Sequence, residues 1–480
     1  MGLKESLVNV SPFVYMLPKG TIQGQKVPVY FYLSEKLFEL LEEDAIRQAG
    51  NAATLPGVEK AIYVMPDVHV GYGFPVGGVM ATNIEEGIIS PGSIGYDINC
   101  GVRLIATNLT ADMVQPVRKE LMQEILKNVP AGVGSTGKLK LSKAELSEVA
   151  IKGARWAIER GFGFEEDLQH IESNGALPGA DPSKVSDLAF KRGAEELGTV
   201  GSGNHFVEVQ YVDEIYDEEV AQRLGLSLGQ VTIMVHSGSR GFGHQVCVDY
   251  LKVAREALKK YKIDIPDMQL ACMPFSSPEG QDYFKAMNSA ANYAFANRQI
   301  LGYLTADTIR RFFGLSWEKF GYRLIYDLAH NIGKVEEHKV NGKRKKLLVH
   351  RKGATRAFPP YNPDIPPAYR DIGQPVLLPG DVGRYSFLLV GQERSMNMSF
   401  GSACHGAGRL MSRSKAKEFV RKEGLEKVLS GLVVVARGKG TVAEEIPQAY
   451  KDISEVAYVV HSLGIAKLVA RFKPLGTLKG

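Results

Sequence analysis

The feature that most constrains this chain is a repeated pattern in which a short apolar segment runs directly into a polar cluster that contains a histidine. Three segments with strand-like character show it: 61–65 before His69, 231–235 before His236, and 324–326 before His330. In α/β enzymes, the reactive groups lie where strands end in glycine-rich turns. The pattern therefore predicts an α/β fold whose functional side chains gather at strand ends.

Helical periodicity between these segments supports a mixed α/β chain. We expect helices after a Ser34 N-cap through Ala45, over 117–129 between two prolines, and over 282–300. Glycine makes up 51 of the 480 residues, which indicates many sharp turns and close backbone approaches. We find neither an internal repeat nor a linker, so we predict a single domain over residues 1–480.

Composition excludes several classes of protein. With 44% hydrophobic and 23% charged residues, the chain resembles globular proteins and not disordered or fibrous ones. Its four cysteines lack the C-x-x-C spacing of zinc knuckles and redox motifs. The sequence has neither an apolar run long enough for a membrane span nor a signal peptide. We therefore expect a cytoplasmic protein that does not bind membranes, and we predict separately that it is a monomer.

Positive charge is concentrated in one window, residues 334–356. It holds nine lysines and arginines against two glutamates, a net charge of +7 on a chain whose total is +5. Such a patch is typical of a protein that binds a polyanion, but a solvated hairpin tip explains it equally well.

Five of the ten histidines stand at strand ends within two residues of Gly, Ser or Asn: His69, His205, His236, His330 and His405. A single histidine of this kind is most often a packed, hydrogen-bonded residue, but five in similar contexts indicate a shared site. Asp97 and Cys100 add a carboxylate and a thiol three residues apart, which reach one ion if the chain turns there. This donor set suits zinc through its sulfur, or manganese through its carboxylate, and the residues alone leave the metal open.

His405 lies in the glycine-rich segment GSACHGAGRLMSR, residues 401–413. Arg409 and Arg413 follow four residues apart, which predicts one helical face directed at phosphates. An accessible histidine between glycines suits a covalent nucleophile or an acid–base catalyst, whereas the simpler alternative is a helix-capping turn. Two guanidinium groups beside a histidine favour the catalytic interpretation.

Eight motifs, taken together and in order, resemble the RtcB-type tRNA-splicing RNA ligases over nearly the whole chain. They are PDVHVGYGFPVG (66–77), GYDINCGVR (95–103), GSGNHFVE (201–208), HSGSRGFGH (236–244), HN (330–331), HRKGATR (350–356), the His405 segment (401–413) and YKD (450–452). The resemblance implies an enzyme that joins an RNA 3′-phosphate or 2′,3′-cyclic phosphate end to a 5′-hydroxyl end, on a fold largely specific to the family.

The resemblance also implies two Mn²⁺ ions and GTP as cofactors. The metal ligands it assigns are Asp97, Cys100, His205, His236 and His330, with the Cys100 thiolate bridging the two ions. His405 would take GMP from GTP as a phosphoramidate and pass it to the RNA 3′-phosphate, and the 5′-hydroxyl would then expel GMP. A cyclic phosphate would first be opened by metal-activated water.

The remaining site residues follow from the same resemblance. Asn204, Arg409 and Arg413 would orient phosphates, and Asp67 would act as a base or as a partner that positions another group. The nucleotide contacts it implies are Asn204, His205, Phe206, Val207, Glu208, His330, Asn331, Pro379, Gly380, Asp381, Val382, Ser386, His405, Gly406, Ala407, Gly408, Tyr450 and Lys479. One position departs from the family, because Asp381-Val382-Gly383 stands where Ser-Met-Gly is common. A carboxylate there could contact ribose or base but would repel phosphate.

The partners implied are RNA, as tRNA exon halves or broken RNA, together with GTP and an activating protein, archease. The basic window could hold an RNA backbone without reading bases. Two rival functions stay open: a dinuclear metal phosphoesterase acting on RNA ends, which would not need a nucleophilic histidine or GTP, and a non-catalytic RNA-binding protein.

Overall fold

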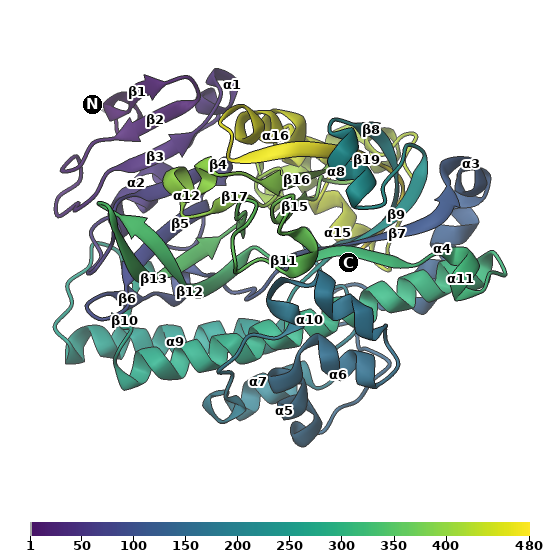
Figure 1. Cartoon of the computed structure of the whole chain (residues 1–480), viewed down its shortest axis with the longest axis horizontal. Helices are drawn as coiled ribbons and strands as arrows, with labels where there is room; N and C mark the ends of the chain where they lie inside the picture. The colour runs from purple at the N-terminus through teal and green to yellow at the C-terminus, as the bar shows by residue number, and fades with distance from the viewer. Residues whose placement is uncertain (1) are drawn as a thin grey trace.

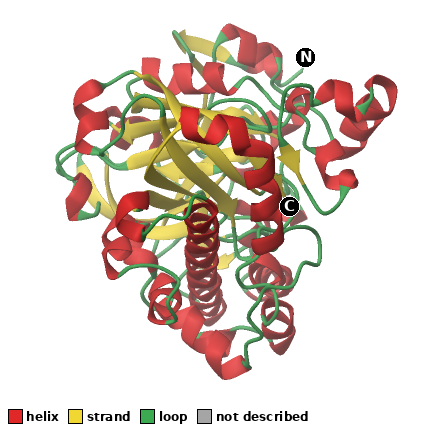
Figure 2. Ribbon diagram, turned by 90° about the vertical axis from the view of Figure 1, so that its right-hand side faces the viewer, coloured by secondary structure: helices red, strands yellow, loops and turns green. Residues whose placement is uncertain are grey.

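The structure is a computed structural model that describes residues 2–480. It is a mixed α/β fold, as the sequence predicts, built around two largely antiparallel sheets with helices packed outside them (Figures 1 and 2). Within these residues, no helix combines the length and the apolar character needed to cross a membrane.

The first sheet has seven strands in the order β1-β2-β3-β4-β5-β13-β12. All neighbours are antiparallel except β3 and β4. Its strands are β1 (Val8–Ser11), β2 (Val14–Leu17), β3 (Val29–Tyr32), β4 (Ile62–His69), β5 (Val76–Asn83), β12 (Asn331–Val340) and β13 (Lys343–Lys352).

The second sheet follows the order β11-β7-β9-β8-β19-β16-β15, with β18 pairing parallel to β19. Its strands are β7 (Gly101–Thr110), β8 (Phe206–Ile215), β9 (Gln230–Ser237), β11 (Arg323–Ala329), β15 (Pro375–Leu378), β16 (Ser386–Gly391), β18 (Val434–Val435) and β19 (Ala466–Lys479). Two short pairs complete the strands: β6 (Ile88–Ile89) with β10 (Met273–Pro274), and β14 (Ala354–Arg356) with β17 (Ser402–Cys404).

The α-helices lie mostly on the outside of these sheets (Figure 2). They are α1 (Glu35–Glu39), α2 (Glu43–Ala52), α3 (Ala111–Val114), α4 (Arg118–Asn128), α5 (Lys143–Lys152), α6 (Ala154–Glu159), α7 (Asp187–Gly193), α8 (Glu218–Arg223), α9 (Arg240–Lys260), α10 (Pro278–Phe312), α11 (Trp317–Phe320), α12 (Arg394–Ser399), α13 (Arg413–Glu423), α14 (Leu425–Val428), α15 (Lys439–Glu444) and α16 (Ile453–Ser462).

The longest helix, α10, has 35 residues and spans about 52 Å at 1.5 Å per residue. It runs beside α9 along the lower side of Figure 1, and most of its residues are buried. A helix buried on nearly every side packs between other layers instead of covering a surface. Its buried polar residues are therefore in a position to hold neighbouring loops.

Most of the predicted elements are present, but several boundaries were wrong. The helix predicted over 282–300 extends over Pro278–Phe312. Ser34 caps a helix by accepting a hydrogen bond from the Leu37 amide, but that helix stops at Glu39. A separate helix begins at Glu43, because Glu42 has extended backbone angles (φ −83°, ψ 136°). The strand predicted over 61–65 continues to His69, with an irregular register between Val64 and His69, so Asp67 lies inside an irregular strand instead of in a turn after it.

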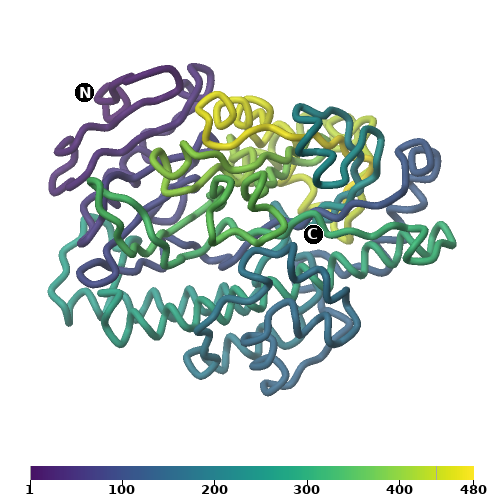
Figure 3. The backbone as a smooth tube through the Cα atoms, viewed as in Figure 1, coloured from purple at the N-terminus to yellow at the C-terminus, as the bar shows by residue number. Residues whose placement is uncertain are grey.

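Several strands of the second sheet begin or end at the same end of that sheet. Antiparallel neighbours alternate in direction, so the start of one strand meets the end of the next. The register pairs at this end are Gly101 with Ser237, Gly101 with Ala329, Phe206 with His236, and Lys479 with Phe206. The C-terminal residues Lys479 and Gly480 are accordingly buried, and Figure 3 shows the chain ending in the middle of that view.

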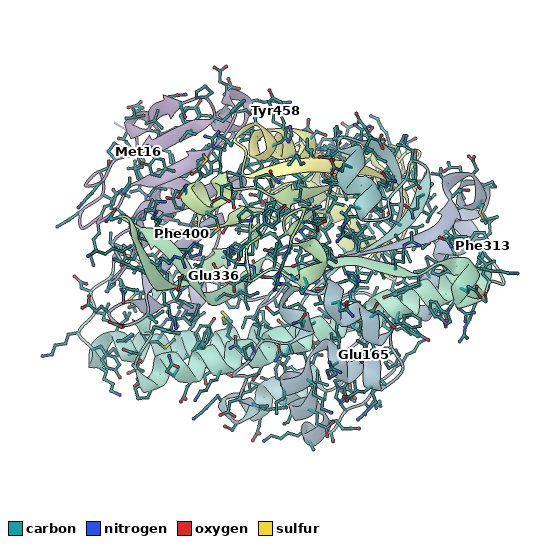
Figure 4. All side chains as sticks on the ribbon, viewed as in Figure 1. Met16, Glu165, Phe313, Glu336, Phe400 and Tyr458 are labelled. Atoms are coloured by element: carbon teal, nitrogen blue, oxygen red, sulfur yellow. The ribbon has the colours of Figure 1, made fainter. Side chains whose placement is uncertain are left out.

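A buried ionic network lies beneath this end of the sheet. Asp327 of β11 accepts hydrogen bonds from Arg103 of β7 (Nε, 2.8 Å) and from Arg298 of α10 (Nη2, 2.9 Å), and all three side chains are fully buried. A second buried pair joins the two hairpin strands of the first sheet, where Arg351 binds Glu336 and also donates to the Phe400 carbonyl (2.9 Å). Glu336 and Phe400 lie close together in Figure 4.

We predict that Asp327→Ala destabilises the protein by about 3–5 kcal/mol, because it leaves two buried guanidinium groups without a counter-charge. Chemical denaturation followed by circular dichroism measures this loss. The matched control is Asp371→Ala, which removes an ion pair to Arg223 whose side chains are 47% and 50% exposed and should cost less than about 1 kcal/mol. Equal losses in the two variants would contradict the prediction.

Candidate active site

A thiol and two imidazoles meet at the end of the second sheet where the paired strands described above begin or end. Cys100 precedes β7, His205 precedes β8, and His236 is the next-to-last residue of β9. The Cys100 Sγ lies 3.4 Å from His205 Nε2 and 3.3 Å from His236 Nε2, and all three side chains are buried. These separations match donor atoms that each bind one ion at about 2.0–2.3 Å.

Asp97 and His330 extend this cluster on opposite sides. The Asp97 Oδ2 lies 2.8 Å from His205 Nε2, and His330 Nε2 lies 3.4 Å from His236 Nε2. The structure therefore brings together all five residues that the sequence suggested as metal ligands. Five donors exceed the four of a tetrahedral zinc site.

Arg298 fixes the two loops that carry these ligands. Its Nη1 donates to the carbonyl of Asn99 (2.7 Å), the residue before Cys100, and to the carbonyl of Ser237 (3.0 Å), the residue after His236. At Gly238 only glycine fits, because a Cβ atom there would lie 2.1 Å from Asp97 Oδ1. The second Asp97 contact is the Ser239 amide, which donates to Oδ1 at 3.0 Å.

Burial prepares the histidines of the cluster for metal binding. It lowers the pKa of His236 and of His330 well below the usual value, with neighbouring imidazoles adding to the effect. Both imidazoles are therefore neutral at physiological pH, as metal ligands must be. Burial and the adjacent Asp97 raise the pKa of the Cys100 thiol, so a metal ion would have to displace the thiol proton. The donor set fits a divalent metal.

His405 lies next to this cluster, directly after β17, and its ring packs edge-on against His330 with 4.9 Å between centroids. Its Nδ1 contacts Asp67 Oδ2. The same Asp67 oxygen accepts hydrogen bonds from the backbone amides of His405 (3.0 Å) and Gly406 (3.3 Å). With Nδ1 turned to Asp67, Nε2 is the imidazole nitrogen left to react.

The charge on Asp67 is stabilised inside the protein. Burial alone would raise the pKa of this carboxyl, but the His405 imidazole and the Lys451 ammonium hold it below its usual value. Asp67 is therefore an ionised acceptor that orients His405, the arrangement by which a carboxylate fixes a catalytic imidazole.

The metal-ligand cluster and His405 line one cleft of about 270 Å³. The predicted residues that line it are Asp97, Cys100, Asn204, Phe206, His236, His330, Asn331, Pro379, Gly380, Asp381, Val382, His405, Gly406, Ala407, Gly408, Arg409, Arg413, Tyr450 and Lys479. His205 is buried and does not line the cleft. Val207, Glu208 and Ser386 lie behind the wall, and Ser386 Oγ accepts the Gly380 amide at 2.9 Å.

The expectation of one helical face bearing both arginines was wrong. Arg409 lies in an irregular turn, and Arg413 is the first residue of α13. Gly406, Ala407 and Gly408 of this turn do not form a helix because the chain follows β4 closely: a Cβ at Gly408 would lie 2.1 Å from the Asp67 carbonyl oxygen. Arg409 is held by Glu445 (2.9 Å) and Tyr450 (3.0 Å), while Arg413 stays 61% exposed.

The basic window does not form one surface patch, so it is a weaker RNA-binding candidate than its charge suggests. Four of its nine cations, Lys334, Arg351, Lys352 and Arg356, are buried. Lys334 and Arg351 pair with buried glutamates. The exposed cations lie toward the turn between β12 and β13, where Arg344 already pairs with Glu337.

Sequence reasoning missed several residues that line the cleft. His69 was noted among the strand-end histidines but given no role, and Lys352 was counted only as part of the basic window. Lys352 donates to the carbonyls of Tyr72 and Gly92, and burial lowers its pKa to about 7. Glu445 was missed because its segment has no motif, and only its contact with Arg409 reveals it.

Comparison with known proteins identifies the family. Residues 48–480 match the family described as tRNA-splicing ligase RtcB. The chain belongs to the RtcB family.

Curated RtcB relatives extend this similarity over the full length. The tRNA-splicing ligase RtcB of Archaeoglobus fulgidus is 53% identical over 484 residues, covering 100% of both chains. The protein of the same name from Methanococcus maripaludis is 50% identical, again over 100% of both chains. That of Thermococcus kodakarensis is 52% identical over 99% of each.

We predict that Cys100→Ala lowers the affinity for Mn²⁺ or Zn²⁺ by at least roughly 10-fold, because the candidate metal site loses its central donor. Equilibrium dialysis with elemental analysis measures the bound metal without any activity assay. The matched control is Cys247→Ala, which alters a buried cysteine on α9 outside the cluster. Metal binding by Cys100→Ala as tight as in the wild type would contradict the assignment.

Proposed function

We propose that this protein is a GTP- and metal-dependent RNA ligase that joins RNA 3′-phosphate or 2′,3′-cyclic phosphate ends to 5′-hydroxyl ends, with the whole chain acting as one catalytic domain. Its membership of the RtcB family, whose relatives are named tRNA-splicing ligases, supports the reaction class. The observation that carries the proposal is a histidine held by a buried carboxylate and packed directly against a metal-ligand cluster.

In this proposal His405 is the nucleophile. Its Nε2 attacks the α-phosphorus of GTP, a P–N bond forms, and pyrophosphate leaves. Asp67 keeps Nδ1 engaged, so it orients the ring and stabilises positive charge that develops on the imidazole. An oxygen of the RNA 3′-phosphate then displaces His405 from the GMP phosphorus. Attack by the 5′-hydroxyl on the activated 3′-phosphate expels GMP and seals the strand.

Two Mn²⁺ ions, which Asp97, Cys100, His205, His236 and His330 would hold, would neutralise phosphate charge during these transfers. The protein itself places the bound phosphate and the nucleophile next to each other. His330 packs against both His236 and His405, so phosphate bound at the cluster would lie beside the nucleophile. Arg413 lines the cleft and is 61% exposed, and RNA or triphosphate oxygens would compete for it with Glu445, which lies 3.5 Å from its Nε.

The substrates we propose are tRNA exon halves or broken RNA, and archease is a possible activator to include in assays. The exposed part of the basic window would contribute a salt-sensitive contact to the RNA backbone, without base specificity. The family name favours a role in tRNA splicing.

We predict that wild-type protein incubated with α-labelled GTP and Mn²⁺ retains the label through an acid-labile, base-stable bond, and that His405→Ala retains none, since it removes the nucleophile. The matched control is His461→Ala, which replaces an exposed histidine at the end of α16 and should label normally. The test is run with and without archease. Label on His405→Ala would move the nucleophile to another residue, whereas no label on the wild type in either case would favour the phosphoesterase alternative.

We predict that Asp67→Asn slows this labelling by roughly 10²- to 10⁴-fold, because an amide can neither fix the imidazole as a charged acceptor nor stabilise its positive charge. Single-turnover kinetics measures the rate at saturating GTP. Circular dichroism checks that the His405 turn, which Asp67 also holds through two backbone amides, still supports a folded protein. A folded Asp67→Asn protein that labels at the wild-type rate would remove Asp67 from the mechanism.

A further inference from the structure

A second cavity lies at the start of strand β11, away from the cleft. Its volume is about 420 Å³, which is within the range of small-molecule sites. Leu324 and Ile325 of β11 line it, whereas His330 of the metal-ligand cluster directly follows the other end of that strand. The distance from Leu324 to His330 along an extended strand is roughly 20 Å. We call this the β11 cavity, and none of the eight sequence motifs contributes a residue to it.

Three aromatic side chains that contact one another line the β11 cavity: Phe164, Trp317 and Tyr322. The ring centre of Phe164 lies 5.3 Å from that of Trp317 and 5.1 Å from that of Tyr322. The Arg310 guanidinium already lies over the Trp317 ring, 4.8 Å from its centre. Aliphatic side chains complete the lining. Aromatic rings attract cations and aliphatic walls pack against methylene groups, so this lining suits a ligand with an apolar chain and a positive end.

Asp167 lines the cavity with one carboxylate oxygen held and the other free. Oδ2 accepts hydrogen bonds from the Phe164 amide (3.1 Å), from Gln299 Nε2 (2.8 Å) and from Tyr322 Oη (3.2 Å). No residue within 2–480 donates a hydrogen bond to Oδ1. The residue is only 3% exposed. An oxygen in this condition costs free energy unless a ligand satisfies it.

His170 and Glu166 add further hydrogen-bond acceptors. The Tyr369 hydroxyl donates to the Ile325 carbonyl, so His170 Nδ1, which lies 2.6 Å from Tyr369 Oη, is the donor in that contact. Burial lowers the pKa of His170, so the imidazole is neutral and its Nε2 carries a lone pair. Glu166 is exposed and forms no ion pair with any described residue. The cavity therefore offers a lone pair and two carboxylates to a donor.

The two arginines that line the cavity are already engaged. Arg223 binds Asp371 through two hydrogen bonds of 2.9 and 3.3 Å. Arg323 donates to the backbone carbonyls of Gly321 (3.1 Å) and Gly225 (3.3 Å). With Asp371 included, three carboxylates stand against two guanidinium groups, which leaves an excess of one negative charge. The charge around the cavity therefore favours a cation.

We propose that the β11 cavity binds a linear aliphatic diamine or polyamine. The methylene chain packs against the aromatic and aliphatic lining. One ammonium group donates to Asp167 Oδ1 and His170 Nε2, and another pairs with Glu166 beside solvent. A neutral ligand of the same shape leaves both carboxylates unpaired. The site is independent of the proposed ligation chemistry, because the cavity shares no residue with the cleft.

Tryptophan fluorescence makes the test direct, because Trp317 lines the cavity and the other tryptophan, Trp156, is 1% exposed and does not. Spermidine and putrescine are titrated into the full-length protein at constant ionic strength, with fluorescence and calorimetry as readouts. We expect saturable binding of one molecule per chain. We expect 1,4-butanediol, the uncharged analogue of putrescine, to bind at least roughly 10-fold more weakly, because it cannot form charge-assisted hydrogen bonds.

Matched variants separate this site from a general attraction of polyamines to acidic surface. We expect Asp167→Asn to weaken spermidine binding by at least roughly 10-fold, because a buried charge-assisted hydrogen bond is lost. Glu166→Gln removes an exposed pair and should weaken binding by roughly 2- to 5-fold. The control is Glu165→Gln, at the residue labelled in the lower part of Figure 4, which pairs with Arg155 and does not line the cavity. Phe164→Leu, which removes an aromatic wall, is the replacement if Asp167→Asn does not fold.

Three results would overturn the assignment. The first is no binding of spermidine to the wild type. The second is equal affinity for putrescine and 1,4-butanediol, which would mean that the cavity recognises an apolar chain and not a cation. The third is an unchanged affinity in the folded cavity variants, or an equal loss in Glu165→Gln. None of them bears on His405, whose labelling is measured separately.

Discussion

The contact between Arg298 and Asp327 is the interaction on which the site depends. Arg298 projects from the middle of α10, binds the Asp327 carboxylate on β11, and donates to the carbonyls of Asn99 and Ser237. One guanidinium group thus holds the loop before Cys100 and the loop after His236 at fixed positions. Because its charge is fully buried, it needs Asp327, and Arg103 shares the same carboxylate. The long helix therefore positions the two loops that carry Cys100 and His236, two residues of the candidate metal site.

The second constraint is the antiparallel order of the sheet. Strand starts and strand ends alternate at one end of the sheet, so residues more than two hundred positions apart meet there, including Cys100 and His330. The same geometry brings Lys479, at the end of the chain, beside the start of β8. His405 follows β17, which pairs with β14 outside the two large sheets, and its imidazole contacts Asp67 of the first sheet. The cleft is thus the meeting point of both sheets, which explains why its residues come from nearly the whole chain.

Much of this could be predicted from local sequence. Apolar segments that end in histidine marked the strand ends, and the Ser34 and proline signals marked helix boundaries. The five metal ligands were assigned by resemblance, and the structure brings them together. What failed depended on tertiary contacts: the turn at Arg409 follows β4 too closely to form a helix, and four cations of the basic window are buried. Glu445 carries no motif, and its contact with Arg409 follows only from the fold.

The central claim is that His405 carries the nucleotide between GTP and RNA, beside the metal cluster. The most direct test isolates the wild-type protein after incubation with GTP and Mn²⁺, maps the modified peptide by mass spectrometry, and then adds RNA with a 3′-phosphate end. The account predicts one GMP on the peptide that contains His405, and transfer of that GMP to the RNA 3′-phosphate when RNA is added. A GMP attached to a lysine, or a His405 adduct that RNA cannot remove, would contradict it.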